Sequence, residues 1–296
     1  MTIYSQVNGN KLKSLFLVLF FIAFFSFVFF IIGKAVGNSS LYFTIGLVFS
    51  LASGIGSYFF SDKLVLASTG AKPANKKEHF NFYTVAENVS IASGLPMPRL
   101  YVIDDPSPNA FATGRDPKHA VVAATTGLLN KLNRTELEGV IAHEFSHIKN
   151  YDILVSSLVA VLAGTLVFVV DWVMRGLWWG GLDDDNRNVN PLIFVFLILT
   201  LIISPIIATL IQLAISRKRE YLADASGALI TRNPDSLADA LLKIASDPQP
   251  LRRASGGTAH LFIESPFKKK KARSFFSSLF STHPPTDERV RILHEM

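Results

Sequence analysis

The chain has 296 residues and no cysteine, 49% of its residues are hydrophobic, and its formal net charge is +6. The lack of cysteine excludes disulfides and zinc–thiolate sites, so a metal ion would need histidine and carboxylate ligands. The mean hydropathy of +0.34 is too high for a simple soluble enzyme of this length. The basic residues lie beside apolar segments rather than in one patch, so we expect no nucleic-acid partner.

Four apolar segments, each near the roughly 20 residues that a helix needs to cross a bilayer, occupy residues 15–32, 41–60, 153–173 and 191–215. The first follows Lys11 and Lys13, as in a signal peptide, but its apolar run is too long and no small-residue cleavage site follows. The third contains Asp171 near its end, and a buried core helix is its alternative interpretation. We therefore expect about four transmembrane helices in two hairpins, 1–61 and 153–215.

The distribution of charge around these segments predicts their orientation. Positive charge marks the cytoplasmic side of short loops. Lys11 and Lys13 precede the first segment, and three consecutive basic residues, 217–219, follow the fourth. We therefore expect both termini, residues 62–152 and residues 216–296 in the cytoplasm, as parts of a multi-pass protein in contact with the lipid bilayer.

The first cytoplasmic part contains patterns of a small α+β domain. Helical spacing of apolar residues over 82–94 predicts a helix that ends at Gly94. Alternation and β-branched residues predict strands at 100–103 and 120–125, with a possible third at 109–112. The whole chain is thus predicted to be α+β, mainly α.

The motif HEFSH, residues 143–147, follows these strands. On a helix, His143 and His147 lie on one face and can bind one metal ion, while Glu144 can take a proton from a water held there. Thr135 and Glu138 predict a capping box at the start of this helix. Two ordinary surface histidines are the alternative. An apolar stripe at helical spacing indicates how the helix would pack against a core; it consists of Leu137, Val140, Ile141, Phe145 and Ile148.

A second pair of polar residues follows the fourth apolar segment. Glu220 and Asp224 are four residues apart, and so lie on one helical face. A membrane hairpin between them and HEFSH would bring both segments to the same membrane edge. Glu220 is then the candidate third metal ligand, and Asp224 would hydrogen-bond the outer nitrogen of a ligating histidine. A solvated helix face is the alternative.

HEFSH, a membrane hairpin and the run 216–224 together resemble the HtpX-type membrane zinc metalloproteases, relatives of the CAAX prenyl endopeptidases. The resemblance covers nearly the whole chain and includes residues 109–114, 121–129, 258–262, 283–286 and Arg289. It implies an integral inner-membrane endopeptidase with a cytoplasmic active site, one Zn²⁺ ion per chain and a role in membrane-protein quality control. It also implies His143, His147 and Glu220 as ligands and Glu144 as the catalytic base.

Zincins that resemble this chain bind substrate as an added strand at a sheet edge. We expect that edge at 109–113, which includes Asn109, Ala110, Phe111 and Ala112. Turn formation after Pro108 is the alternative for Asn109.

The C-terminal part contains one more candidate catalytic residue. His283 precedes two prolines, so its backbone is extended. It could lie near the zinc and stabilise the oxyanion, a role that Tyr221 could also take; a structural histidine is the alternative. The remaining four histidines, at 79, 119, 260 and 294, lack ligand spacing and are expected to be structural or solvent-facing. The basic and aromatic segment 262–280 matches no family role, and either contact with anionic lipid or a solvated loop would explain its Lys268–Lys271 cluster.

The predicted function is zinc-dependent hydrolysis of peptide bonds in misfolded membrane proteins and unfolded polypeptides at the cytoplasmic side, with self-cleavage. A non-catalytic peptide-binding scaffold is disfavoured because the ligands and the base are all present. A transporter is disfavoured because the apolar segments contain almost no charge. A prenyl-protein protease is disfavoured because four spans cannot enclose a large helical chamber. No feature of the sequence specifies an oligomeric state.

Overall fold

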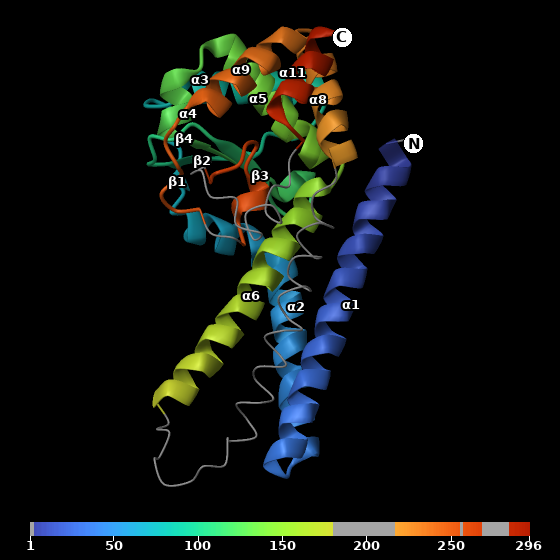
Figure 1. Cartoon of the computed structure of the whole chain (residues 1–296). Helices are drawn as coiled ribbons and strands as arrows, with labels where there is room; N and C mark the ends of the chain where they lie inside the picture. The colour runs from blue at the N-terminus through green and yellow to red at the C-terminus, as the bar shows by residue number, and fades with distance from the viewer. Residues whose placement is uncertain (1–2, 180–216, 255–256, 268–283) are drawn as a thin grey trace.

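The computed structural model describes residues 3–179, 217–254, 257–267 and 284–296. Three long helices extend away from a domain in which shorter helices pack around a four-stranded sheet (Figure 1). The fold is therefore mainly helical α+β, as predicted.

The first two long helices, α1 (Ile3–Val36) and α2 (Ser39–Thr69), form an antiparallel hairpin (Figure 1). A Cβ at Gly46 would lie 2.5 Å from Cβ of Phe29, so the glycine lets the two helices pack closely. Both helices are long and apolar enough to cross a membrane. The structure thus confirms the predicted apolar hairpin, although α2 continues beyond the expected end of that hairpin at residue 61.

The third long helix, α6 (Asp152–Trp179), packs against α1 and α2 (Figure 1). It follows α5 (Arg134–Lys149) after a bend of 83°. Tyr151 lies in the bend with φ = 60°, a left-handed conformation that costs a bulky residue energy. Among the described residues, two helices, or three if α5 and α6 form one bent span, satisfy the length and composition of a membrane span. The predicted fourth segment, 191–215, lies outside the described residues.

The sheet contains β1 (Lys72–Pro73), β2 (Arg99–Ile103), β3 (Ala110–Thr113) and β4 (Val121–Thr125) in the order β1-β2-β4-β3. Strands β2 and β4 are parallel, and the other two pairs are antiparallel. The three predicted strands are confirmed, and β3 lies at an edge of the sheet. The two-residue strand β1 was not predicted because it is too short to show an alternating pattern.

The described part of the domain also contains six shorter α-helices, most of which lie on one side of the sheet (Figure 1). They are α3 (Phe80–Ser93), α4 (Thr126–Lys131), α5, α8 (Arg217–Thr231), α9 (Pro234–Ser246) and α11 (Thr286–His294). The helix predicted at 82–94 is confirmed as α3, with Gly94 in the left-handed C-cap position. Helix α5 lies between α3, α8, α9 and β3, so it is the centre of the core.

The apolar stripe predicted for α5 is confirmed, since all five of its residues are buried. The predicted capping box at Thr135 and Glu138 is wrong. Asn133 is the N-cap, its side chain accepts from the backbone N–H of Glu136, and the Glu136 carboxylate accepts from the backbone N–H of Asn133. Asparagine is as good an N-cap as serine or threonine. Asn133 and Glu136 have the same three-residue spacing as Thr135 and Glu138, two residues earlier in the chain.

Candidate active site

The structure brings α8 against the middle of α5, which places Glu220 opposite the histidines of HEFSH. Close packing of the two helices depends on Gly227 of α8. A Cβ at this position would lie 3.1 Å from the backbone nitrogen of His143. A larger residue would therefore push α8 away from α5 and separate Glu220 from the histidines.

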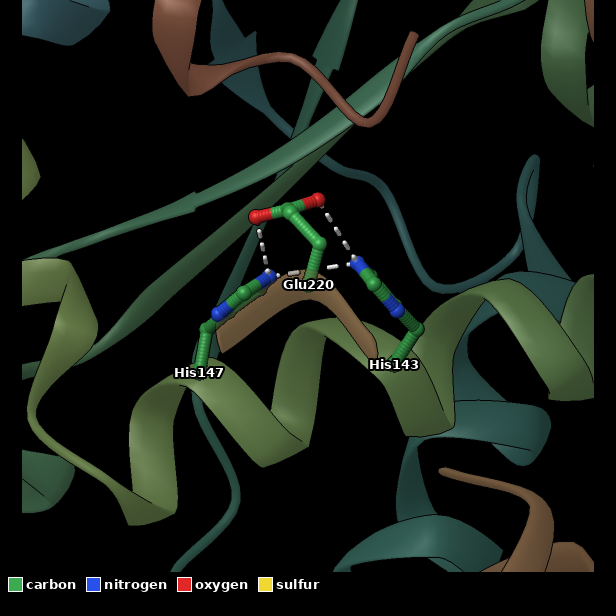
Figure 2. A group of neighbouring side chains, drawn as sticks. All are labelled: His143, His147 and Glu220. Carbon is green, nitrogen blue, oxygen red and sulfur yellow. Dashed lines mark hydrogen bonds and ion pairs between the residues drawn. The ribbon is translucent and has the colours of Figure 1, made fainter. Parts of the chain in front are cut away.

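Three side chains converge between the two helices (Figure 2). Nε2 of His143 lies 3.1 Å from Nε2 of His147. The carboxylate of Glu220 spans both rings, with Oε2 4.0 Å from Nε2 of His143 and Oε1 3.6 Å from Nε2 of His147. One donor atom from each residue lies within 4.8 Å of the other two. This is a group that could hold a metal ion.

The chemistry of these donors fits a cation. Each histidine directs its other ring nitrogen, Nδ1, toward a carboxylate, at 2.9 Å from Asp224 and at 3.1 Å from Asp152. A proton on Nδ1 leaves both Nε2 atoms as lone-pair donors that face each other and Glu220. Such an arrangement is repulsive unless a positive charge lies between the donors. Two imidazole nitrogens and one carboxylate are a ligand set that suits zinc in a catalytic site.

The protonation of the two histidines agrees with this interpretation. Burial lowers the pKa of His143 despite the neighbouring Asp224. Burial acts in the same direction on His147, but Asp152 and Glu220 outweigh it and raise the pKa of His147 to about 9. His147 is therefore the ring that carries a proton at neutral pH when no metal ion is bound.

On the His143 side, Asp224 contacts the ring and is itself paired with Arg289, near the C-terminus. Nε and Nη2 of Arg289 donate to the two oxygens of Asp224 at 2.8 and 2.6 Å. Burial alone would raise the pKa of Asp224, but the buried Arg289 outweighs it and lowers that pKa to about 2. The contact of Asp224 with Nδ1 of His143 is close but not well directed as a hydrogen bond. Asp224 thus contacts His143 as a charged carboxylate, and its role beside a metal ligand stays a prediction.

On the His147 side, support comes from Asp152, the first residue of α6. Oδ2 of Asp152 lies 3.1 Å from Nδ1 of His147. Oδ1 of Asp152 accepts from Nη1 of Arg219 at 3.1 Å and from Nδ2 of Asn10 at 2.8 Å. Sequence reasoning missed all three supporting residues. Their only local signal is the position of Asp152 five residues after His147.

Glu144 lies beside this group and is only 2% exposed. Burial raises its pKa to about 7; nearby Glu220 adds to this, while His147 and a backbone hydrogen bond from Ala112 of β3 oppose it. A carboxylate with a pKa near neutrality can both accept and return a proton. A cavity of about 30 Å³ adjoins Glu144 and the three convergent side chains, which is enough room for a water molecule.

The predicted substrate residues of β3 are in different environments. Ala112 lines the cavity. Ala110 accepts a backbone hydrogen bond from Ile263 at 2.9 Å, and Asn109 donates to the backbone oxygen of Glu264 at 2.9 Å, so that end of the strand is already paired. Phe111 packs edge-on against Phe262. Of the four residues, only Ala112 faces the cavity.

Two further residues singled out in the sequence, His260 and Tyr221, can also be placed. His260 is buried, hydrogen-bonds the backbone oxygen of Ser156 at 3.0 Å and lines the cavity. The only indication in the sequence that His260 lies near the site is its place in the run 258–262, which is part of the family resemblance. The hydroxyl of Tyr221 hydrogen-bonds Glu288, and Tyr221 is not among the cavity-lining residues. His283 lies outside the described residues.

Comparison with known proteins agrees with the geometry. The sequence profile of peptidase family M48 matches residues 77–296. The protease HtpX homologue of Tropheryma whipplei (strain Twist) is 46% identical over 99% of this chain and 98% of its own. The protease HtpX homologue of Caldanaerobacter subterraneus subsp. tengcongensis is 42% identical over 100% of this chain and 98% of its own. The crystal structure of S. mikatae Ste24p aligns with 98% of this chain and 67% of that chain at 17% identity and a TM-score of 0.49. By the family profile and the two HtpX homologues, the chain belongs to peptidase family M48 and is an HtpX-type metallopeptidase, as its motifs predicted.

Proposed function

We propose that this chain is a zinc-dependent membrane endopeptidase in which His143, His147 and Glu220 hold the ion and Glu144 is the general base. The observation that carries the proposal is the convergence of the three donor atoms beside a buried carboxylate. The outer carboxylates, Asp224 and Asp152, would fix the orientation and the tautomer of the two rings.

Each group in the cleft has a role in peptide hydrolysis. When bound, a zinc ion supplies positive charge and Lewis acidity. Glu144 takes a proton from the attacking water and returns it to the nitrogen of the leaving amine, a double role for which a pKa near 7 is suited. The backbone of the substrate pairs with β3 at its Ala112 end, where the strand reaches Glu144. His283 remains our proposal for a donor to the oxyanion.

The proposed substrates are membrane proteins and unfolded polypeptides, and their removal is a form of quality control. The proposal is supported by the position of the cleft, because Asp152, Ile153 and Ser156 line it and belong to the first turns of α6. A scissile bond in the cleft would thus lie near the ends of the long apolar helices. Residues 62–152 and 216–296 form the cytoplasmic part in this proposal, the hairpins 1–61 and 153–215 cross the inner membrane, and flexible segments of the chain itself are substrates.

The test is a paired assay on the purified full-length protein in detergent. We expect one zinc per chain by mass spectrometry, and cleavage of casein that is lost on chelation. Glu144→Gln should keep the zinc but reduce cleavage by at least about 1,000-fold, because the proton acceptor is removed. Glu138→Gln makes the same change on the same helix and should cleave as the wild type does.

Two results would contradict the proposal. Substantial cleavage by Glu144→Gln would remove the role of general base from that residue. Zinc-free protein that neither binds added zinc nor cleaves casein would exclude the metal centre. For self-cleavage, equal rates of chain nicking in wild type and Glu144→Gln would exclude the chain as its own protease.

A further inference from the structure

A second cavity lies between the three long helices, and its lining residues on α6 differ from those that line the first cavity. Its volume is about 800 Å³, within the ~300–1,000 Å³ range of ligand pockets. Residues of α1, α2 and α6 form its walls, and the loop 115–118 after β3 covers its domain end. Its apolar lining consists of Leu15, Val18, Ile55, Phe59, Leu154 and Leu158.

The charged residues of this cavity gather at one end. Lys11 lies one turn before Leu15 on α1, and Arg115 and Lys118 belong to the covering loop. The one acid, Asp116, is engaged by His119 at 2.8 Å and by Arg115 at 3.5 Å. Within the described residues, neither Lys11 nor Lys118 forms an ion pair. The cavity therefore combines an apolar body with a cationic rim.

Two of these cations are held in place by aromatic rings. The ammonium of Lys11 lies 4.6 Å from the ring centroid of Tyr151, and the guanidinium of Arg115 lies 5.4 Å from that of Phe59. Cation–π contacts orient a cation without neutralising it. Lys11 and Lys118, which form no ion pair in the described part of the chain, thus leave positive charge at the rim for an anion that enters with the apolar ligand.

We propose that this cavity binds an anionic phospholipid, with one acyl chain between α1, α2 and α6 and the phosphate at Lys11, Arg115 and Lys118. The occupant would come from the bilayer, because α1 and α2 have the length and hydropathy of membrane spans. A lipid with a net negative headgroup matches the excess of cations over acids at the rim.

Native mass spectrometry of the full-length protein, released from nanodiscs of equal parts phosphatidylcholine and phosphatidylglycerol, tests this site. Wild type should retain one phosphatidylglycerol in preference to phosphatidylcholine. Arg115→Gln with Lys118→Gln should lower that retention by about fivefold for each cation removed. Lys72→Gln with Lys77→Gln removes the same charge from the domain surface and should change nothing.

A second pair of variants tests the apolar part of the cavity. Leu15→Trp should exclude the acyl chain and abolish retention of both lipids, since Leu15 lines the cavity and is 55% exposed. Leu12→Trp, on the same helix but outside the lining, should leave retention unchanged. Equal retention of the two lipids by wild type, or equal phosphatidylglycerol retention by wild type, Leu15→Trp and the Arg115/Lys118 variant, would overturn the proposal.

The hydrogen bonds of Asn10 support a second inference, which rests on the proposed zinc site. Asn10 of α1 is buried and uses both N–H groups of its amide at the α5–α6 bend. One reaches the backbone oxygen of Asn150 at 2.9 Å, and the other reaches Oδ1 of Asp152 at 2.8 Å. Since the other oxygen of Asp152 contacts His147, the first long helix reaches the proposed ligand through one carboxylate.

The geometry points to Asn10 as a positioning residue that orients Asp152 and, through it, the ring of His147. Asn10→Ala should lower zinc affinity by about tenfold, the smaller end of the effect of losing an outer contact of a metal ligand. Asn10→Leu, which keeps the size of the side chain, should do the same. In an Asp152→Ala background, Asn10→Ala should have no further effect on zinc affinity, because the intermediary is absent.

Zinc affinity is measured by chelator competition on the full-length protein, with thermal unfolding recorded alongside. Asn8→Ala, an exposed asparagine on the same helix, is the matched control and should bind zinc as wild type does. Unchanged zinc affinity in Asn10→Ala and Asn10→Leu, or equal losses in both backgrounds, would overturn this inference alone. Failure of wild type to bind zinc would instead overturn the proposed function.

Discussion

The two histidines of the candidate site are held in different ways. His143 is fully buried and is supported by Asp224 and Arg289, so its surroundings belong entirely to the domain core. The side chain of His147 is 16% exposed and is supported by Asp152, at the point where α6 leaves the domain. One half of the site is therefore anchored in a rigid core, and the other half is anchored where the long helices meet the domain.

Arg289 and Asp224 form a bidentate pair without solvent, which is expensive to break because it leaves a buried charge behind. Asp152 instead accepts from residues of two other helices, Asn10 and Arg219. We expect changes on the His143 side to act on folding, and changes on the His147 side to act on metal binding.

The largest expected effect is that of Arg289→Met. It leaves Asp224 charged, buried and unpaired, and should destabilise the protein by about 3–5 kcal/mol. Arg291→Met, on the same helix, breaks only an exposed pair with Glu295 and should cost less than about 1 kcal/mol. Denaturant unfolding of both variants in detergent measures the difference. Equal stability of the two would contradict the assignment of His143 to a rigid core.

Asp152→Asn should destabilise the fold less than Arg289→Met does, but it should clearly weaken metal binding. The neutral amide supports the ring of His147 less well, so zinc affinity should fall by about 10–100-fold. The unfolding midpoint of the zinc-free protein should fall less than in Arg289→Met, since the amide oxygen of asparagine can still accept the hydrogen bonds from Asn10 and Arg219. Chelator competition measures the affinity. A loss of stability as large as that of Arg289→Met would show that the two supports are equivalent.

Low pH should lower the stability of the fold through Asp224, on the His143 side of the site. The pKa of Asp224 is lowered to about 2 from its usual 3.8. A group with a depressed folded-state pKa contributes its stability above the unfolded pKa and loses it as pH falls toward the folded one. About 2 kcal/mol of stability should therefore be lost between pH 3.8 and about 2. Unfolding midpoints over this range should fall in wild type and stay flatter in a variant without the pair, Asp224→Asn with Arg289→Met.

The last prediction concerns the proton that His147 binds when zinc is absent. Because the pKa of His147 is raised to about 9, the zinc-free ring is protonated below that pH, and zinc must displace the proton. Zinc affinity should thus rise by about tenfold per pH unit between about pH 7 and about 9, and level off above. Chelator competition at several pH values measures the slope. Asp152→Asn should flatten it, and an unchanged slope in that variant would show that Asp152 does not set the charge of His147.

Local patterns in the sequence predicted the parts of this site that depend on helical spacing. HEFSH places two rings on one face, the apolar stripe from Leu137 to Ile148 buries the opposite face, and the spacing of Glu220 and Asp224 puts both on one side of α8. The failed capping box shows the limit of such patterns, since Asn133 and Thr135 are both acceptable caps and only the backbone decides between them.

The supports of the two histidines could not be predicted in the same way. Asn10 and Asp152 are 142 residues apart, and Asp224 and Arg289 are 65 residues apart. No periodic pattern connects residues at such distances, because their contact depends on how whole helices pack. The same is true of Ile263, whose backbone covers part of the strand that was expected to be free for substrate.

The most direct test of the central claim is X-ray absorption at the zinc edge on purified full-length protein. We predict one zinc with two imidazole nitrogens and one carboxylate oxygen at about 2.0–2.2 Å, and a loss of one imidazole from the spectrum in His147→Ala. A zinc environment without imidazole, or one that is identical in wild type, His147→Ala and Glu220→Ala, would contradict the claim.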